Sequence, residues 1–389
     1  MRKSALLALG LVVTLLVTLG LVVLSSASEA NGVKLYGDAQ HFMKRQFIYL
    51  GVGVFLSVVA AWLDYHFWRK FPILMWLAFG AVLVLLVLVL PEFLGRAVKG
   101  SCRWLNVGPV NIQPSEFAKL MTVISLAVWL DRAGTQIGSF MRGIFVPGLM
   151  IAALAVPILR EPDFGSVMVV GSTGLLILLV AGVNLWWWFG VLAGGFGVVA
   201  VKVLSNPNRM ARIAAWFGSS LSVGADIADK AAEQAAYQAR MALVAIKNGG
   251  ILGVGLGESM QKQYYLPEAH TDFIFAVGAE ELGIIFTLAV LFLFLSLFAL
   301  TVYIAWHAAD RFGRYLVVGM GFILFFQAIF NLGVVCAALP TKGMALPFFS
   351  YGGTNMLSAF VAVGTIFSVG IRTVRGSRRK VRGHGFPRG

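Results

Sequence analysis

Long apolar runs separated by polar breaks dominate the chain, and this pattern predicts ten membrane-spanning helices. About 20 apolar residues suffice to cross a bilayer as a helix. The first run, at 5–24, could also be a signal peptide before Ser25-Ser26-Ala27, but it is longer than a usual signal core. The predicted spans are 5–24, 47–63, 72–90, 117–130, 143–159, 166–183, 185–204, 273–305, 315–335 and 356–371.

The longest polar segment, 205–271, separates the seventh and eighth predicted spans. Its alanine-rich part, 228–246, places Tyr237, Met241 and Val244 on one stripe, which predicts an amphipathic helix at the membrane surface. The sequence GGILGVGLGE follows at 249–258. No strand precedes it and no Lys-Ser/Thr pair follows, so a bent backbone that lets helices approach is favoured over a nucleotide-binding loop.

Composition supports an integral membrane protein and excludes a soluble domain. The 389 residues are 59% hydrophobic and 12% charged, with a mean hydropathy of +0.85. We expect an all-α polytopic bundle over 1–371 and a basic tail over 372–389. The formal charge of +14 therefore indicates contact with anionic lipid headgroups, not with nucleic acid.

The basic tail also predicts the orientation in the membrane. Positive residues beside a span favour the cytoplasm, and ten spans place both termini there, with the 205–271 loop outside. Lys44, Arg45, Lys99 and Arg103 then fall in outer loops, against the usual bias. An anionic substrate on that face would account for them.

Asp272 stands where the long polar segment ends and the eighth apolar run begins. An ionisable residue at the edge of a membrane is costly and is a candidate functional residue. The alternative is that Asp272 only caps the helix that follows. Position alone does not decide between the two.

Other charged residues fall at the predicted outer ends of the spans. Glu116 and Lys119 could pair at i,i+3 spacing or face a polar cavity. Asp163 could cap the sixth span. Glu280 and Glu281 cannot both face lipid, so at least one must line a cavity or meet a cation. Cations available to an outward-facing site are Arg45, Arg103, Lys119, Arg160, Lys262 and Lys342.

Four long motifs in this sequence resemble the SEDS family (shape, elongation, division and sporulation). They are GSCRWLNVGPVNIQPSEFAKL, REPDFGS, GGILGVGLGESMQKQYYLPEAHTDFIFAVGAEELG and LPTKGMALPFFSYGGTN. The resemblance runs in order from the first to the tenth span, and the LPTKG sequence is more similar to the division branch than to the elongation branch.

The resemblance implies a ten-helix peptidoglycan glycosyltransferase of the bacterial cytoplasmic (inner) membrane that polymerises lipid II. It also implies a class B penicillin-binding protein and other divisome membrane proteins as partners. The family's essential aspartate corresponds to Asp272, so the resemblance favours catalysis over capping. The other polar positions then become expected substrate-binding residues: Arg45, Arg103, Glu116, Lys119, Asp163, Lys262, Glu281, Lys342 and Ser350.

The chemistry implied by the family suits a single carboxylate base. Asp272 would accept the proton of an attacking sugar hydroxyl, and nearby cations would stabilise the leaving pyrophosphate. A Mg²⁺ or Mn²⁺ ion could be shared with that pyrophosphate; no nucleotide is needed, because the donor is already activated. The alternatives are a lipid II flippase, an elongation-type polymerase, and a scaffold that only recruits a synthase.

Overall fold

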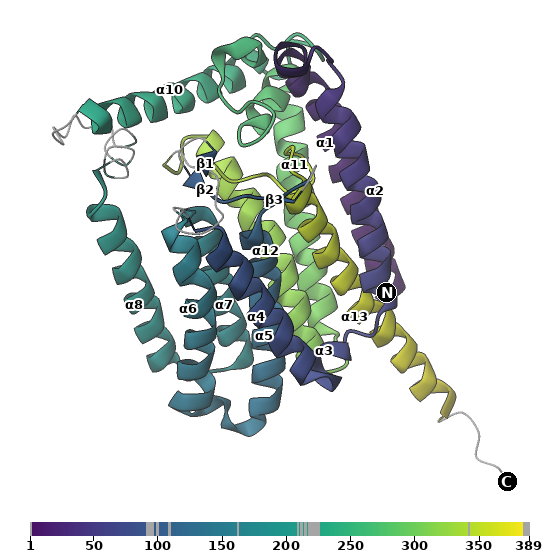
Figure 1. Cartoon of the computed structure of the whole chain (residues 1–389). Coiled ribbons are helices and arrows are strands. Elements are labelled where there is room, and N and C mark those ends of the chain that lie inside the picture. The colour runs from purple at the N-terminus through teal and green to yellow at the C-terminus, as the bar shows by residue number, and fades with distance from the viewer. Residues whose placement is uncertain are drawn as a thin grey trace.

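The computed structural model is a bundle of long helices with two small β-hairpins at one end (Figure 1). It describes residues 2–90, 97–98, 101–107, 110–161, 163–207, 210, 213, 216, 226–340 and 343–383. The α-helices are α1 (Arg2–Tyr36), α2 (His41–Trp62), α3 (Phe67–Lys70), α4 (Pro72–Leu88), α5 (Pro114–Ala133), α6 (Val146–Arg160), α7 (Phe164–Ala181), α8 (Leu185–Leu204), α10 (Asp226–Gly249), α11 (Ile274–Trp306), α12 (Arg311–Val335) and α13 (Gly353–Gly383).

Short elements complete the described fold. In antiparallel pairs, β1 (Ala97–Val98) joins β2 (Ser101–Cys102), and β3 (Leu105–Val107) joins β4 (Val110–Ile112). One 3₁₀ segment, η1, and two π segments, η2 and η3, lie between helices. Their bounds are Gly134–Gly138, Phe140–Phe145 and Gln261–Tyr265. The hairpins were not foreseen, because each strand is only two or three residues long.

Each of the ten predicted spans is helical. Eight described segments are long and apolar enough to cross a membrane by length and composition. The remaining two are α4, which is apolar but short, and α5, which carries four charged residues. The membrane character is therefore confirmed, and ten as the number of crossings stays a prediction.

α1 and α13 extend furthest beyond the spans that the hydrophobic pattern predicted. α1 continues past Leu24 through the expected loop and ends at Tyr36, where Gly37 takes a φ of 66°. Its extension is polar but partly internal, since Ser26 and Ser28 are buried. α13 likewise continues past Ile371 to Gly383. A hydropathy pattern marks where a helix leaves apolar surroundings, not where its backbone hydrogen bonding stops.

The core of the bundle lies around α5 and α12, which are buried along most of their length. α5 packs against α4, α7 and α12, and α11 packs against α1, α10 and α12. α8 has no buried residue and stands at one edge (Figure 1). Such an all-round apolar, uncovered helix is suited to a lipid environment.

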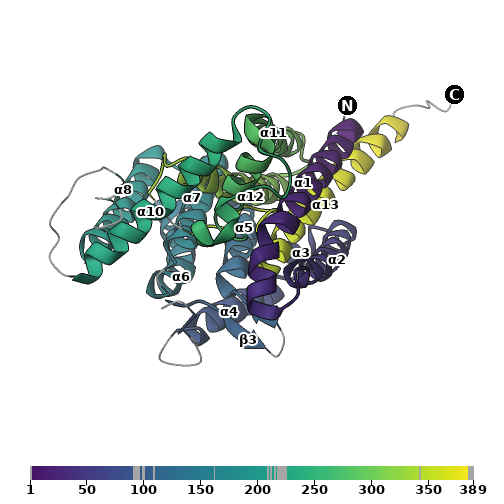
Figure 2. The ribbon, with the colours of Figure 1, turned by 90° about the horizontal axis from the view of Figure 1, so that it is seen from above.

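The predicted amphipathic helix is confirmed as α10, which crosses above the end of the bundle from α11 toward α8 (Figures 1 and 2). Its buried face is formed by Ala235, Ala242 and Ala245, not by the predicted stripe, since Tyr237 is exposed and Met241 and Val244 are only partly buried. The α1 start and the α13 end lie on the side of the bundle away from α10.

α11 is interrupted at Gly283, whose φ of 72° and ψ of −166° are not helical. The glycine-rich segment 249–258 fits into the break. Ile284 donates its backbone N–H to Gly250 O at 3.0 Å, and Val254 donates to Glu280 O at 3.0 Å. The predicted bent backbone is thus confirmed, and it replaces the helical hydrogen bonds that the break removes.

Close packing at this break permits only glycine at Gly283. A Cβ atom there would overlap Ile251 O and lie 2.5 Å from Gly253 N. We therefore expect Gly283→Ala to lower stability by about 1–3 kcal/mol, because it adds a clash to an unfavourable φ. The measurement is the thermal unfolding midpoint of the detergent-solubilised protein.

The matched control is Gly80→Ala in α4, where an added Cβ meets nothing within 4 Å. It should leave the midpoint unchanged or raise it, because alanine is the better helix former. Equal midpoints for Gly283→Ala and the unsubstituted protein would contradict the tight junction described here.

Candidate active site

Asp272 lies just before α11 and is partly exposed. The helix begins at Ile274, and its N-cap position is held by Phe273 without a side-chain capping bond. The capping interpretation of Asp272 is therefore wrong, because the residue precedes the cap. Its carboxylate is left at the end of the bundle that carries α10 and the hairpins.

Buried polar side chains fix the backbone around Asp272. Asn331 of α12 donates its amide N–H groups to Asp272 O at 2.7 Å and to Met344 O at 2.6 Å. Ser350 donates to Thr271 O at 2.6 Å and accepts from Leu346 N at 2.7 Å. These bonds tie the segment before α11 to the segment before α13, so the carboxylate sits on a rigid support.

Gly343 packs directly against the Asp272 carboxylate. A Cβ atom at Gly343 would overlap Asp272 Oδ2, so only glycine fits while the carboxylate keeps its orientation. Gly343 belongs to the LPTKG motif. The preceding residue, Lys342, lies outside the described residues, and its predicted role in substrate binding is untested.

Arg45 is exposed and lies close enough to Tyr351 for its charge to act on the Tyr351 hydroxyl. Burial raises the pKa of the Tyr351 hydroxyl, and the positive charge of Arg45 opposes that rise. Tyr351 N donates to His270 O at 3.0 Å, and the two rings lie 6.2 Å apart. Arg45 is thus placed beside the segment that carries Asp272.

Glu116 and Lys119 form an ion pair of 2.7 Å inside the bundle, as their spacing allowed. Both are buried, and Ser358 of α13 donates to the second carboxylate oxygen of Glu116 at 2.7 Å. The pair joins α5 to α13 just below the polar end.

Glu281 meets a cation, which confirms the expectation for the adjacent glutamates. Lys262 Nζ lies 3.1 Å from Glu281 Oε1, and both side chains are buried. Ser26 of α1 bonds both groups, accepting from Lys262 Nζ at 2.7 Å and donating to Glu281 Oε1 at 2.5 Å. Glu280 accepts instead from Ser259 and from Asn248. This buried cluster fastens the long loop to α1 and α11.

Asp163 caps α7, as one interpretation predicted, by accepting from Ser166 N at 3.4 Å. Its second oxygen accepts from the hydroxyls of Ser166 at 2.6 Å and Ser115 at 3.4 Å. Arg103 lies nearby and donates its Nε to Glu161 O at 3.3 Å. Burial, with the Asp163 charge, raises the pKa of Glu161 to about 8, and Arg103 opposes the rise.

The predicted site residues thus form several groups. Ser350 holds the backbone beside Asp272. The Glu116–Lys119 and Lys262–Glu281 pairs are two separate buried clusters. Asp163 and Arg103 both lie beside Glu161. Sequence reasoning missed four contributors: Ser26, Glu161, Asn331 and Gly343. Asn331 and Glu161 carried a usable signal, because a polar side chain in or beside an apolar span is uncommon.

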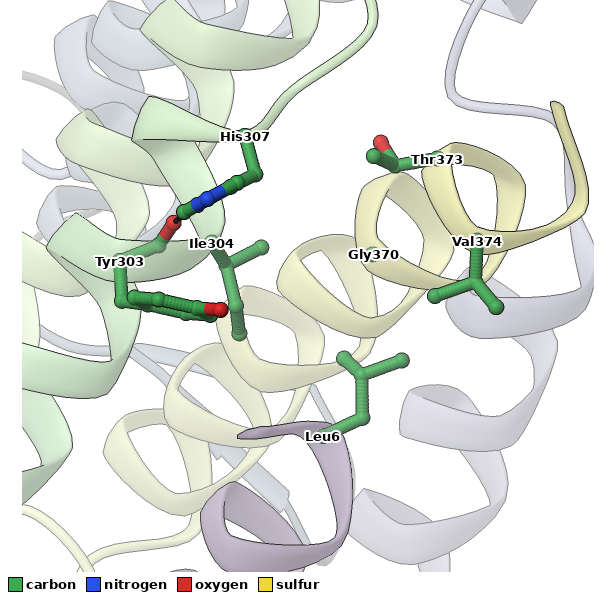
Figure 3. Close-up of a pocket in the computed structure, with 7 residues that line it drawn as sticks. All are labelled: Leu6, Tyr303, Ile304, His307, Gly370, Thr373 and Val374. Carbon is green, nitrogen blue, oxygen red and sulfur yellow. Dashed lines mark hydrogen bonds between the residues drawn. The ribbon is translucent and has the colours of Figure 1, made fainter. Parts of the chain in front are cut away.

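A small pocket lies at the opposite end of α11 from Asp272, lined by Leu6, Tyr303, Ile304, His307, Gly370, Thr373 and Val374 (Figure 3). Its lining contains no carboxylate and it lies away from Asp272, so it is not the candidate active site. Among the described residues, no group of three or more His, Cys, Asp or Glu side chains could hold a metal ion.

Comparison with known proteins decides the family. The profile of the family described as "Cell cycle protein", which groups FtsW, RodA and SpoVE, matches residues 6–374. The chain belongs to this family.

Two relatives of this FtsW/RodA/SpoVE family carry an activity in their names. Both are called probable peptidoglycan glycosyltransferase FtsW. The Coxiella burnetii protein is 36% identical, over 92% of this chain and 94% of its own. The Legionella pneumophila protein is 37% identical, over 91% and 88%.

A solved structure shares the family fold. It has 25% identity and a TM-score of 0.72, covering 94% of this chain and 97% of its own, and is described as structural coordination of polymerization and crosslinking by a peptidoglycan synthase complex. The predicted all-α membrane fold of the family is therefore confirmed.

The contact between Gly343 and Asp272 gives a test of the site. We expect Gly343→Ala to turn the carboxylate away and to lower enzymatic activity about 100-fold, the usual effect of a small displacement of a catalytic group. The measurement is glycan synthesis by the purified protein. Gly352→Ala, in the same loop, is the control, since its Cβ would meet only Asn355 Cβ at 3.7 Å. Similar activity of the two variants would show that Gly343 does not constrain Asp272.

The Lys262–Glu281 pair gives a test of stability. Lys262→Met leaves Glu281 as an uncompensated buried charge, so the free energy of unfolding should fall by about 3–5 kcal/mol. The double variant Lys262→Met/Glu281→Gln removes that charge and should recover most of the loss. Thermal unfolding in detergent measures both, and failure of the double variant to recover would mean that Lys262 acts through other contacts.

Proposed function

We propose that this protein is a peptidoglycan glycosyltransferase that polymerises lipid II at the outer face of the bacterial cytoplasmic membrane. The observation that carries the proposal is the partly exposed Asp272 carboxylate, held at the polar end of an apolar bundle by Asn331, Ser350 and Gly343. A lipid-linked sugar presents its reacting atoms at that depth, with its tail in lipid and its sugars in water. The names of the FtsW relatives support the same activity.

The proposed reaction is an inverting glycosyl transfer. The acceptor hydroxyl attacks the anomeric carbon of the donor, a new C–O bond forms, and the bond to the lipid pyrophosphate breaks. Asp272 accepts the hydroxyl proton, and the electron pair of the broken bond leaves on the pyrophosphate. One base is sufficient, because pyrophosphate is a good leaving group without protonation.

We propose that cationic side chains stabilise the negative charge on the leaving pyrophosphate. Arg45 is exposed beside the Asp272 segment, and Lys342 precedes the glycine that packs on the carboxylate. Arg103 is partly buried near Asp163. A positive charge placed where negative charge develops stabilises the transition state.

The remaining proposed substrate contacts have partners within the bundle. Lys119 and Lys262 each pair with a glutamate, and Ser350 holds backbone. We propose that Glu116, Lys119, Lys262, Glu281 and Ser350 act chiefly by shaping the walls of the site. No nucleotide is required; a Mg²⁺ or Mn²⁺ ion, when bound, would neutralise charge on the pyrophosphate.

Cell division is the proposed setting, since the relatives are named FtsW. A class B penicillin-binding protein is the proposed partner, in keeping with the polymerisation and crosslinking named for the similar synthase complex. Other divisome membrane proteins are further proposed partners. Both termini would lie in the cytoplasm, with α10 outside.

A lipid II flippase is the second candidate, because interrupted helices such as α11 often form transport sites. At a transport site the carbonyls of the break are free to coordinate an ion. Here Glu280 O and Glu281 O accept from Val254 N and Gly255 N at 3.0 and 3.1 Å. The filled break is better suited to a rigid support than to a moving gate.

Replacement of Asp272 tests the proposed chemistry. Asp272→Asn keeps the size of the side chain and removes the base, so glycan synthesis from lipid II should fall about 10²- to 10⁴-fold. Folding should survive, since Phe273 and not Asp272 holds the N-cap position. Asp272→Glu keeps the base but displaces it, and should retain partial activity.

The control for Asp272→Asn is Glu258→Gln, which removes an exposed carboxylate of the same loop. It should polymerise normally. Near-normal polymer from Asp272→Asn would reject the proposed base, and loss of the variant from the membrane fraction would assign Asp272 a structural role instead.

A further inference from the structure

Glu161 is the most unusual charged residue among those described. It lies in the turn between α6 and α7 and is 0% exposed. Both of its carboxylate oxygens are buried without a hydrogen-bond partner. The other buried glutamates, Glu116, Glu280 and Glu281, each accept at least one hydrogen bond.

The described neighbours of Glu161 leave its carboxylate without a hydrogen bond. Arg103 approaches but donates its Nε to the backbone oxygen of Glu161 at 3.3 Å. Asp163, also buried, lies close enough for its charge to act on Glu161, and it adds repulsion. Two acidic side chains, Glu161 and Asp163, therefore lie near each other. The Arg103 guanidinium is close, but it does not pair with the Glu161 carboxylate.

Burying a carboxylate without a partner is unfavourable, so such a group calls for an explanation. One explanation is a proton, which makes Glu161 a neutral acid. Another is a bound metal cation, which the polypeptide itself does not supply. A hard divalent ion such as Mg²⁺ or Mn²⁺ binds carboxylate oxygens, and one or two protein carboxylates suffice when substrate phosphates supply further ligands.

Hydrogen bonds connect this turn to the support of Asp272. Gln113 donates its side chain to Asp163 Oδ2 at 3.5 Å and its backbone N–H to Thr354 Oγ1 at 3.2 Å. Thr354 lies in the first turn of α13, four residues after Ser350, which holds Thr271. These bonds connect the turn that carries the two acids to the segment that supports Asp272.

We propose that Glu161, together with Asp163, binds a divalent cation, to which the pyrophosphate of the lipid-linked donor adds further ligands. This inference rests on the proposed function and names the residues that would hold its cation. The two carboxylates would leave coordination positions for water and for the phosphate oxygens of the donor. Arg103, beside the same turn, would meet a further phosphate oxygen.

The experiment measures Mn²⁺ binding to the full-length protein in detergent, without substrate. Bound Mn²⁺ loses the sharp electron paramagnetic resonance signal of the free ion, so a titration gives the affinity directly. We expect Glu161→Gln to weaken Mn²⁺ binding about tenfold or more, at least as much as loss of an outer-shell partner typically does. Asp163→Asn, which keeps a capping side chain for α7, should also weaken it.

The matched control is Glu29→Gln, which removes an exposed carboxylate in the outer part of α1. It should leave the Mn²⁺ affinity unchanged. The alternative is that Glu161 is protonated and has only a structural role. Glutamine resembles the protonated acid, so in that case Glu161→Gln should bind Mn²⁺ as the unsubstituted protein does. That result, or an absence of Mn²⁺ binding by the unsubstituted protein, would overturn the proposal.

A second measurement separates this inference from the proposed function. Polymerisation of lipid II is followed as the Mn²⁺ concentration is raised. Glu161→Gln should need about tenfold or more Mn²⁺ for half-maximal rate, with the rate recovered at high Mn²⁺. Inactivity of the unsubstituted protein with normal Mn²⁺ binding would reject the glycosyltransferase and leave the cation site standing. An unchanged Mn²⁺ requirement in Glu161→Gln would reject the cation site alone.

Discussion

The arrangement of the polar end depends on how the break in α11 satisfies its backbone groups. A helix that stops at Gly283 loses hydrogen bonds, and a membrane provides no water to replace them. The glycine-rich segment supplies donors to Glu280 O and Glu281 O and an acceptor to Ile284 N. Because its backbone must approach this closely, the long loop is fixed against α11 just below Asp272.

The buried charges extend this support to the other helices. Lys262 and Glu281 join the loop to α1 through Ser26, and Glu116 with Lys119 joins α5 to α13. A buried ion pair contributes little net stability, but removing one partner is costly, so such pairs specify one arrangement strongly. They hold five elements in the relative positions that Asp272 requires.

The sequence alone predicted those features that depend on local spacing. The apolar runs located the helices, and the i,i+3 spacing anticipated the Glu116–Lys119 pair. The alanine-rich segment anticipated α10, although its buried face is formed by alanines and not by the stripe of Tyr237, Met241 and Val244. Features that depend on distant partners were not accessible. Ser26 meets Lys262 only because α1 continues beyond its apolar run, and the break at Gly283 is invisible because glycine is common in spanning helices. Polarity identified Asp272 as a candidate, whereas its support by Asn331 required the fold.

The carboxylates at this end of the bundle differ in how accessible they are to a substrate. Glu116 and Glu281 are matched with lysines, and Asp163 and Glu280 have oxygens occupied by hydroxyl donors. A general base must reach a proton on the substrate, and a buried, paired carboxylate cannot do so without breaking its own contacts. Asp272 is partly exposed, and its carboxylate packs against Gly343. Of these five acids, Asp272 is the one that is partly exposed and can meet a substrate proton, whereas the buried contacts of the other four hold the surrounding elements together.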